Sequence, residues 1–144
     1  MIEQDTVRLL RECDAGVKMG LASLDDMVDH ARSRELRNCL AGCRNKHEAL
    51  DSEIQELLNQ YHDEGKSPSA MAKGMSWMKT NMKLSMEDSD RTIADLITDG
   101  CNMGVKSLRK YLNQYEAADE RSKDAAKRLI DLEEKLVRDV RSFL

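Results

Sequence analysis

Side chains that could do metal or nucleophilic chemistry are few in this chain of 144 residues, which has three histidines and four cysteines. His47 has the most suggestive surroundings, because Cys39 and Cys43 precede it at intervals of four residues. Such spacing places soft metal ligands on one face of a helix. However, eight helical residues span about 12 Å, so one ion cannot bind both Cys39 and His47. Cys43 and His47 would need a further ligand from Cys13 or Cys101, and we expect cysteines packed as small hydrophobic residues instead.

A second arrangement pairs His47 with Glu133, because both fall on otherwise apolar helix faces. A buried histidine facing a buried carboxylate can share a hydrogen bond, which would raise the pKa of the histidine. The simplest interpretation is a structural pair that fixes the register of two helices. Two alternatives stay open: a histidine that binds an ordered water, and a metal site for Fe, Mn or Zn built from His47, Glu133 and Cys43.

Four long segments must position these residues, at about 5–31, 34–62, 89–115 and 118–143, and in each of them apolar residues recur at helical spacing. The second segment has the most regular pattern, with alternating steps of four and three residues, typical of a heptad core seam. The residues on this seam are Leu36, Leu40, Cys43, His47, Leu50, Ile54, Leu57 and Tyr61.

Residue preferences at helix ends predict where these segments begin and end. Asp5 or Thr6 is expected to cap the first helix, Ser33 the second, and Asp88 or Ser89 the helix that starts near residue 89. Gly65 suits the left-handed position that follows the second helix.

An internal repeat relates the two halves of the chain. The sequence Met19-Gly20-Leu21-Ala22-Ser23-Leu24 returns 84 residues later as Met103-Gly104-Val105-Lys106-Ser107-Leu108, and a shift of 86 places Glu133 on His47. We therefore predict one all-α domain over residues 1–144, a four-helix bundle of two helical hairpins (5–62 and 89–144). A long helical crossover at 63–88 would span the bundle, so that the two helices flanking it run parallel.

The chain resembles a bacterial ferritin-like group of unknown function that is distantly similar to rubrerythrins. The two hairpins carry this resemblance together with four short stretches, which are 74–79 (Gly-Met-Ser-Trp-Met-Lys), 87–90 (Glu-Asp-Ser-Asp), Asp99-Gly100 and 108–112 (Leu-Arg-Lys-Tyr-Leu). None of these stretches is a catalytic signature, so the resemblance implies a ferritin-like four-helix bundle more than it implies a chemistry.

The ligand pattern of ferritin-like di-iron proteins is missing from this sequence. Those sites take one Glu from each of two helices and a Glu-x-x-His motif from each of the other two. Here Arg44 stands three residues before His47, the last helix has no histidine, and Lys18 and Asn102 stand where related proteins tend to have acids. We therefore expect no metal and no cofactor.

A methionine stripe marks the crossover. Met71, Met75, Met78, Met82 and Met86 repeat at helical spacing beside Trp77, the only tryptophan, in a stretch with four lysines and no acid. The simplest interpretation is a helix that packs its methionines on the bundle. An adaptable surface for a second copy or another protein, and a membrane-surface helix, are the alternatives. The predicted partner or dimer contacts are Met71, Met75, Trp77, Met78 and Met82.

Composition narrows the classes of function. The chain is 40% hydrophobic, 35% charged and 3% aromatic, and its net charge of −4 argues against nucleic-acid binding. It has no apolar run of about 20 residues and no signal sequence, which favours a cytoplasmic protein with reduced cysteines. No phosphate-binding loop or nucleophile–base pair occurs, so we expect no enzyme and no catalytic residue. Function through protein–protein contacts, as a homodimer or with another protein, is the leading hypothesis, and a divergent metal or redox protein is the alternative.

Overall fold

The computed structural model of the chain describes residues 2–66 and 89–144. All regular structure in these residues is helical. Four long helices, α1 (Ile2–Val28), α2 (Arg34–Gln60), α4 (Ser89–Gln114) and α5 (Glu120–Val140), are followed by a short 3-10 helix, η1 (Arg141–Phe143). This confirms the predicted all-α fold with four long helices. The helical crossover predicted at 63–88 lies outside the described residues from residue 67 onward.

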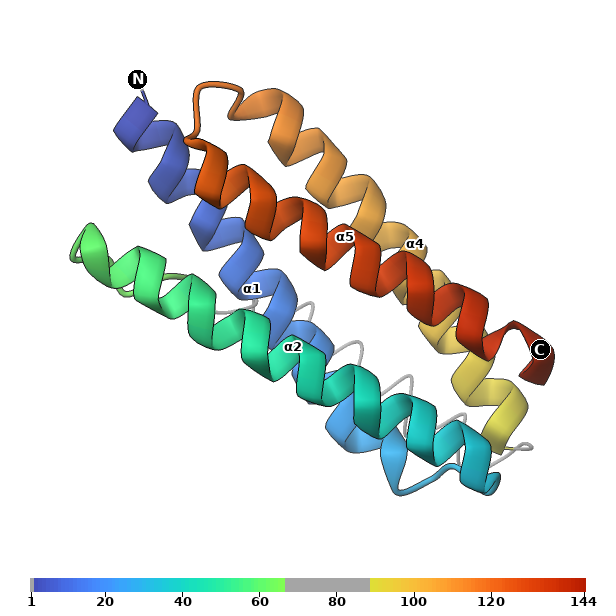
Figure 1. The fold of residues 1–144 in the computed structure, drawn as a ribbon. Helices are drawn as coiled ribbons and strands as arrows, with labels where there is room; N and C mark the ends of the chain where they lie inside the picture. Colours follow the sequence, from blue (N-terminus) through green and yellow to red (C-terminus); the bar gives the residue numbers. More distant parts are fainter. Residues whose placement is uncertain (1, 67–88) are drawn as a thin grey trace.

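The four helices pack side by side as a bundle of two antiparallel hairpins (Figure 1). Helix α1 pairs with α2 and α4 pairs with α5, while α5 also contacts both helices of the first hairpin. Helix α2 ends at one end of the bundle and α4 begins at the other, so these two helices run parallel (Figure 1). Their parallel course was predicted from the length of the connection between them.

The ends of the first two helices show why one capping prediction is right and another is wrong. Ser33 caps α2 as predicted, since its Oγ accepts a hydrogen bond from the backbone N–H of Leu36 at 3.3 Å. Helix α1, however, begins at Ile2, so that Asp5 and Thr6 lie inside it and do not cap it. The side chains of these two residues instead accept hydrogen bonds from the turn between α4 and α5.

The end of α2 also differs from the prediction. Gly65 has a positive φ of 85°, as expected, but it does not follow the helix directly. The left-handed residue next to the helix is His62, with a φ of 54°. The N–H of His62 donates to the carbonyl of Asn59 and that of Asp63 to the carbonyl of Leu58, each at 3.1 Å. These two bonds form a Schellman motif, with histidine in the position that glycine usually fills.

At the start of α4, Ser89 also departs from its predicted role. Its hydroxyl is buried and makes no hydrogen bond within the described residues, and Asp88, the other predicted cap, lies outside them. The carboxylate of Asp90 accepts hydrogen bonds from the backbone N–H groups of Arg32 at 2.6 Å and Ser33 at 2.9 Å. The start of α4 therefore holds the turn between α1 and α2.

This contact has a counterpart at the other end of the bundle. The N–H of Asp119 donates to Oγ1 of Thr6 at 2.8 Å, as that of Ser33 donates to Asp90. Thr6 and Asp90 are 84 residues apart, and Ser33 and Asp119 are 86 apart, which are the two offsets of the sequence repeat. Each capping residue is thus held by the first helix of the opposite hairpin, and the hairpins are related by an approximate two-fold axis across the middle of the bundle.

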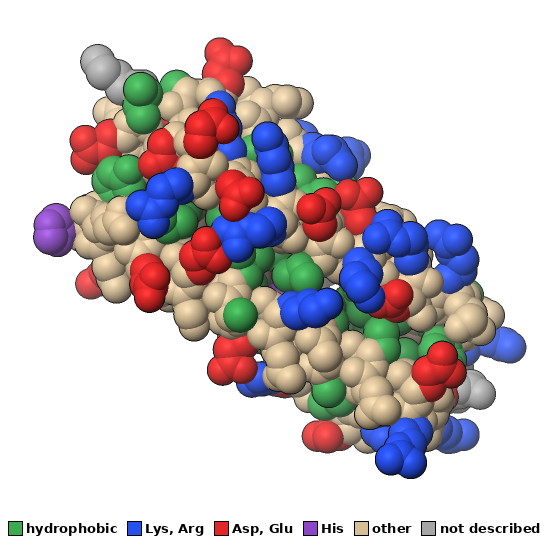
Figure 2. Space-filling view, in the orientation of Figure 1, with side chains coloured by type: hydrophobic (Ala, Val, Ile, Leu, Met, Phe, Trp, Pro, Cys, Tyr) green, Lys and Arg blue, Asp and Glu red, His purple; other side chains and the backbone are tan. Residues whose placement is uncertain are grey.

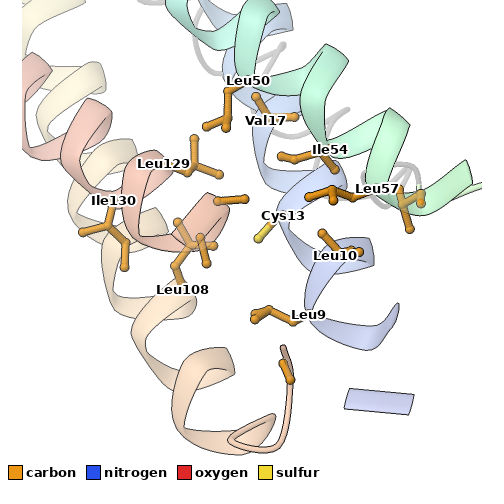
Figure 3. Close-up of a cluster of buried hydrophobic side chains, with 14 residues drawn as sticks. Leu9, Leu10, Cys13, Val17, Leu50, Ile54, Leu57, Leu108, Leu129 and Ile130 are labelled. Carbon is orange, nitrogen blue, oxygen red and sulfur yellow. The ribbon is translucent and has the colours of Figure 1, made fainter. Parts of the chain in front are cut away.

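The hydrophobic core is divided into two clusters, one toward each end of the bundle. Figure 3 shows the cluster around Cys13, where side chains from α1, α2, α4 and α5 converge. The repeat exchanges the clusters: Leu50 lies in the first and its equivalent Leu136 in the second, while Leu40 lies in the second and its equivalent Ala126 in the first. Most of the predicted seam on α2 is buried, and Cys43 and Tyr61 are half-buried.

Candidate functional site

The middle layer of the bundle, between the two core clusters, holds the polar residues that sequence analysis selected. We define it as His47 on α2, Glu133 on α5 and the two glycines that face them, Gly20 on α1 and Gly104 on α4. On every helix these positions lie between a residue of the first cluster and a residue of the second. The layer therefore lies close to the approximate two-fold axis.

His47 is held against its own helix and against Gly20. Its Nδ1 lies 2.9 Å from the carbonyl oxygen of Cys43 and therefore donates to it, and 3.5 Å from the Sγ of the same cysteine. A Cβ added to Gly20 would lie 3.0 Å from Cδ2 and 3.2 Å from Nε2 of His47, so the glycine leaves the space that the ring fills. Burial lowers the pKa of His47, and the Cys43 carbonyl offsets this in part.

Glu133 lies against Gly104 in the same manner. A Cβ added to Gly104 would be 2.6 Å from Oε2 and 2.8 Å from Oε1 of Glu133. Oε2 is buried and has no hydrogen-bond partner among the described residues. Burial raises the pKa of Glu133 to about 8, so the carboxyl group is mostly protonated at neutral pH. It also helps to raise the pKa of Cys101, although burial of that thiol is the main cause.

We expected His47 and Glu133 to share a hydrogen bond that raises the pKa of His47, and this expected rise is wrong. Nδ1 of His47 is used by a carbonyl of its own helix, and Oε2 of Glu133 is unpartnered in the described structure. The pKa of His47 is lowered and not raised, because burial outweighs the favourable contacts. Each polar side chain fills the gap left by the glycine of its own hairpin, which the pairing of seams did not predict.

The middle layer does not fit a two-metal carboxylate centre. The positions on α1 and α4 that face the layer are glycines, and the space beside them is filled by the side chains of His47 and Glu133. Arg44 turns outward and binds Asp25 and Glu48, both at 2.5 Å. Within residues 2–66 and 89–144, no three or more Cys, His, Asp or Glu side chains are grouped so that they could hold one ion.

The cysteines fall into two pairs. Cys13 and Cys101 are buried as predicted, and burial raises the pKa of each to about 12. Cys39 and Cys43 are only half-buried, which corrects the expectation of four buried cysteines. The two half-buried thiols line a hollow of about 310 Å³ between α2 and α5.

A buried carboxylate that sequence analysis missed lies on α1. Asp14 is fully buried and accepts hydrogen bonds from Nε2 of Gln55 at 2.6 Å, the N–H of Lys66 at 2.9 Å and Nζ of Lys18 at 3.1 Å. A Cβ at Gly65 would lie only 2.2 Å from Asp14. Asp14 thus fixes the segment after α2 on α1. Its position on the apolar stripe of the first helix was a signal that could have revealed it.

The surface of the described residues is a mixture of charges. Acidic and basic side chains alternate on the face formed by α2 and α5 (Figure 2). Arg128 of α5 joins the hairpins there, since its Nη1 and Nη2 bind Oε2 and Oε1 of Glu53 at 2.7 and 2.5 Å. No helix in the described ranges has an apolar stretch long enough for a bilayer. The predicted contacts Met71, Met75, Trp77, Met78 and Met82 lie outside the described residues.

Comparison of the chain with protein-family models, curated proteins and solved structures gave no match.

Proposed function

We propose that this chain is a ferritin-like bundle of the bacterial cytoplasm that works through contacts with other proteins and has no di-iron centre. Two antiparallel hairpins with parallel α2 and α4 support the ferritin-like assignment. The single observation that carries the proposal is the packing of the middle layer. His47 and Glu133 occupy the space beside Gly20 and Gly104, which a ligand set from α1 and α4 would need.

The proposed contact surface is the methionine-rich stretch, as the sequence suggests. Methionine side chains adapt to different partner surfaces, and five of the nine methionines lie in this stretch. We propose that two copies of the chain associate through Met71, Met75, Trp77, Met78 and Met82. This assignment depends on the sequence pattern alone.

Size-exclusion chromatography with light scattering tests this association. The wild type is expected to be a dimer, and the double variant Met75→Glu/Met78→Glu a monomer, because two carboxylates would be buried without partners. Met103→Glu is the matched control, since Met103 is 70% exposed on α4 and should leave the dimer intact. A monomeric wild type, or a dimer that survives the double substitution, would overturn the proposal.

The second candidate function is a divergent metal or redox protein using His47, Glu133 and Cys43, with Fe, Mn or Zn. The unpartnered Oε2 of Glu133 favours it, because a buried polar atom without a partner is costly and can mark a ligand position. Metal analysis of the purified protein separates the two candidates.

A further inference from the structure

A pair of free thiols opens into the hollow between α2 and α5. Cys39 and Cys43 are four residues apart on α2, so their side chains share one face of the helix. Gly42 and Lys46 of the same helix line the hollow with them, and α5 contributes Lys135 together with apolar and acidic side chains. The remaining lining residues are Glu35, Asn38, Leu132, Leu136, Asp139 and Phe143. This α2–α5 face is the one seen in Figure 2.

The helical spacing of the two thiols favours a bridging ion over a disulfide. Cβ atoms four residues apart on a helix are separated by about 5–6 Å. A disulfide needs a Cβ–Cβ distance of about 3.5–4.5 Å, so that Cys39 and Cys43 could not form one without distorting α2. An ion held by two metal–sulfur bonds of about 2.3 Å each spans the wider gap with the helix intact.

The small number of available ligands selects the class of ion. In the part of the chain that the structure describes, no third Cys, His, Asp or Glu side chain joins the two thiols in a group that could hold an ion. Zinc takes four ligands in structural sites, whereas soft thiolates select monovalent copper, which needs fewer. Nδ1 of His47 lies 3.5 Å from Sγ of Cys43, but it donates to the Cys43 carbonyl, so its lone pair is not available as a ligand.

Charged side chains of both signs surround the two thiols, with Lys46 and Lys135 opposite in charge to Glu35 and Asp139. Binding of Cu(I) to two thiols releases two protons to water and leaves a complex of one negative charge, with no change of oxidation state. Burial raises the pKa of Cys43 to about 11, and the charges of Cys39 and Asp139 add to this, whereas Lys46 and Lys135 lower it. Lys46 would stabilise the negative charge of the complex, whereas Lys135 forms an ion pair with Asp139 at 2.6 Å.

We propose that Cys39 and Cys43 form a two-coordinate binding site for Cu(I) in the hollow between α2 and α5. The site is separate from the middle layer, since it uses neither His47 nor Glu133. Because two protons are displaced, the apparent affinity rises by about 100-fold per pH unit below the thiol pKa values.

An anaerobic competition titration tests the site, with Cu(I) supplied as its bicinchoninate complex to the full chain. The wild type is expected to take one Cu(I) with high affinity. Cys39→Ser and Cys43→Ser should each weaken binding by about 100-fold or more, because the remaining thiol loses the advantage of chelation. Cys13→Ala is the matched control, since Cys13 lies in the first core cluster, and it should bind as the wild type does.

Two lysine variants test whether a positive charge beside the thiols contributes to Cu(I) binding. Lys46→Gln should weaken Cu(I) binding several-fold, while Lys110→Gln, an exposed lysine on α4, should not. Thermal unfolding followed by circular dichroism confirms that each variant is folded. Unchanged binding by Cys39→Ser, loss of binding in Cys101→Ala, or X-ray absorption that shows a nitrogen neighbour or three sulfurs would overturn the two-thiolate site.

Discussion

Gly20 and Gly104 leave the space that the two central polar side chains occupy. In each case the glycine faces a longer residue of the same hairpin: an added Cβ would be tight against His47 at Gly20 and too close to Glu133 at Gly104. Glycine weakens a helix, so its presence inside α1 and α4 is best explained by this close approach. The close packing of His47 and Glu133 against these glycines offsets the cost to helix stability.

Substitutions in α4 should separate the two effects. Gly100→Ala should stabilise the protein by about 0.5–1 kcal/mol, since nothing lies within 4 Å of the added Cβ and alanine favours the helix. Gly104→Ala should gain less or destabilise, because the carboxyl group of Glu133 has to move. In a Glu133→Ala background, Gly104→Ala should gain as much as Gly100→Ala. Urea unfolding measures all four variants, and equal effects of both glycine substitutions in the wild-type background would contradict the close approach.

Glu133 should also make the stability depend on pH. Its pKa is raised from 4.5 to about 8 by burial, so the folded state keeps a proton that the unfolded state loses. Between these two values the free energy of unfolding should fall with rising pH, by up to about 1.4 kcal/mol per pH unit. Glu133→Gln should remove this dependence, so its advantage over the wild type grows up to about pH 8 and then levels.

Urea unfolding at a series of pH values measures this difference. Glu134→Gln is the control, because Glu134 lies at the surface beside Arg109. Parallel stability profiles for the wild type and Glu133→Gln would show that Glu133 is not buried as described.

Among the helices, the start and the core face of α2 were predicted best, whereas the C-terminal end of the same helix was predicted least well. The heptad pattern and Ser33 determine the core face and the start of the helix, and both agree with the structure. Its end follows from tertiary contacts that no local pattern contains, because Asp14, distant in sequence, holds Lys66 and leaves no room for a Cβ at Gly65. The turn itself is then made at His62; histidine is found at positive φ more often than most residues with a Cβ, but glycine adopts this conformation at lower cost.

His62 therefore carries a conformational cost that glycine would remove. His62→Gly should stabilise the protein by about 1 kcal/mol, since a left-handed conformation is strained for a residue with a Cβ. His30→Gly, in the turn after α1, should not stabilise it, because the added freedom of the unfolded chain is not compensated. Thermal unfolding compares the two variants, and a loss of stability in His62→Gly would contradict this description of the turn.

Asp14 should be the most sensitive position at the junction of α1 and α2. Asp14→Ala should cost about 1–3 kcal/mol, because the part-buried amide of Gln55 and backbone N–H of Lys66 lose the buried carboxylate that accepts their hydrogen bonds. Asp51→Ala is the control, since Asp51 accepts only a long hydrogen bond of 3.4 Å from Nε2 of the same Gln55. Denaturant unfolding that gave equal losses for both variants would contradict the central role of Asp14.

For the whole molecule, the repeat predicted more than the individual seams did. The offsets of 84 and 86 predicted two related helical hairpins, and the same two offsets relate the exchanged core clusters and the contacts of Thr6 with Asp119 and of Asp90 with Ser33. The sequence could not reveal that His47 and Glu133 each face a glycine of their own hairpin. Seam patterns report which residues are buried but not which neighbour each side chain meets, and that neighbour depends on how closely two helices approach.

The central claim is that the side chains of His47 and Glu133 fill the middle layer and leave no metal site there. The metal content of the untagged protein, purified anaerobically, tests this claim most directly. Iron, manganese and zinc are measured per chain in the wild type and in His47→Ala. We predict less than about a tenth of an equivalent of each in both proteins, since the layer lacks the ligands that such ions need. Nearly one equivalent of metal in the wild type, lost in His47→Ala, would contradict the account and would make the layer a working metal site.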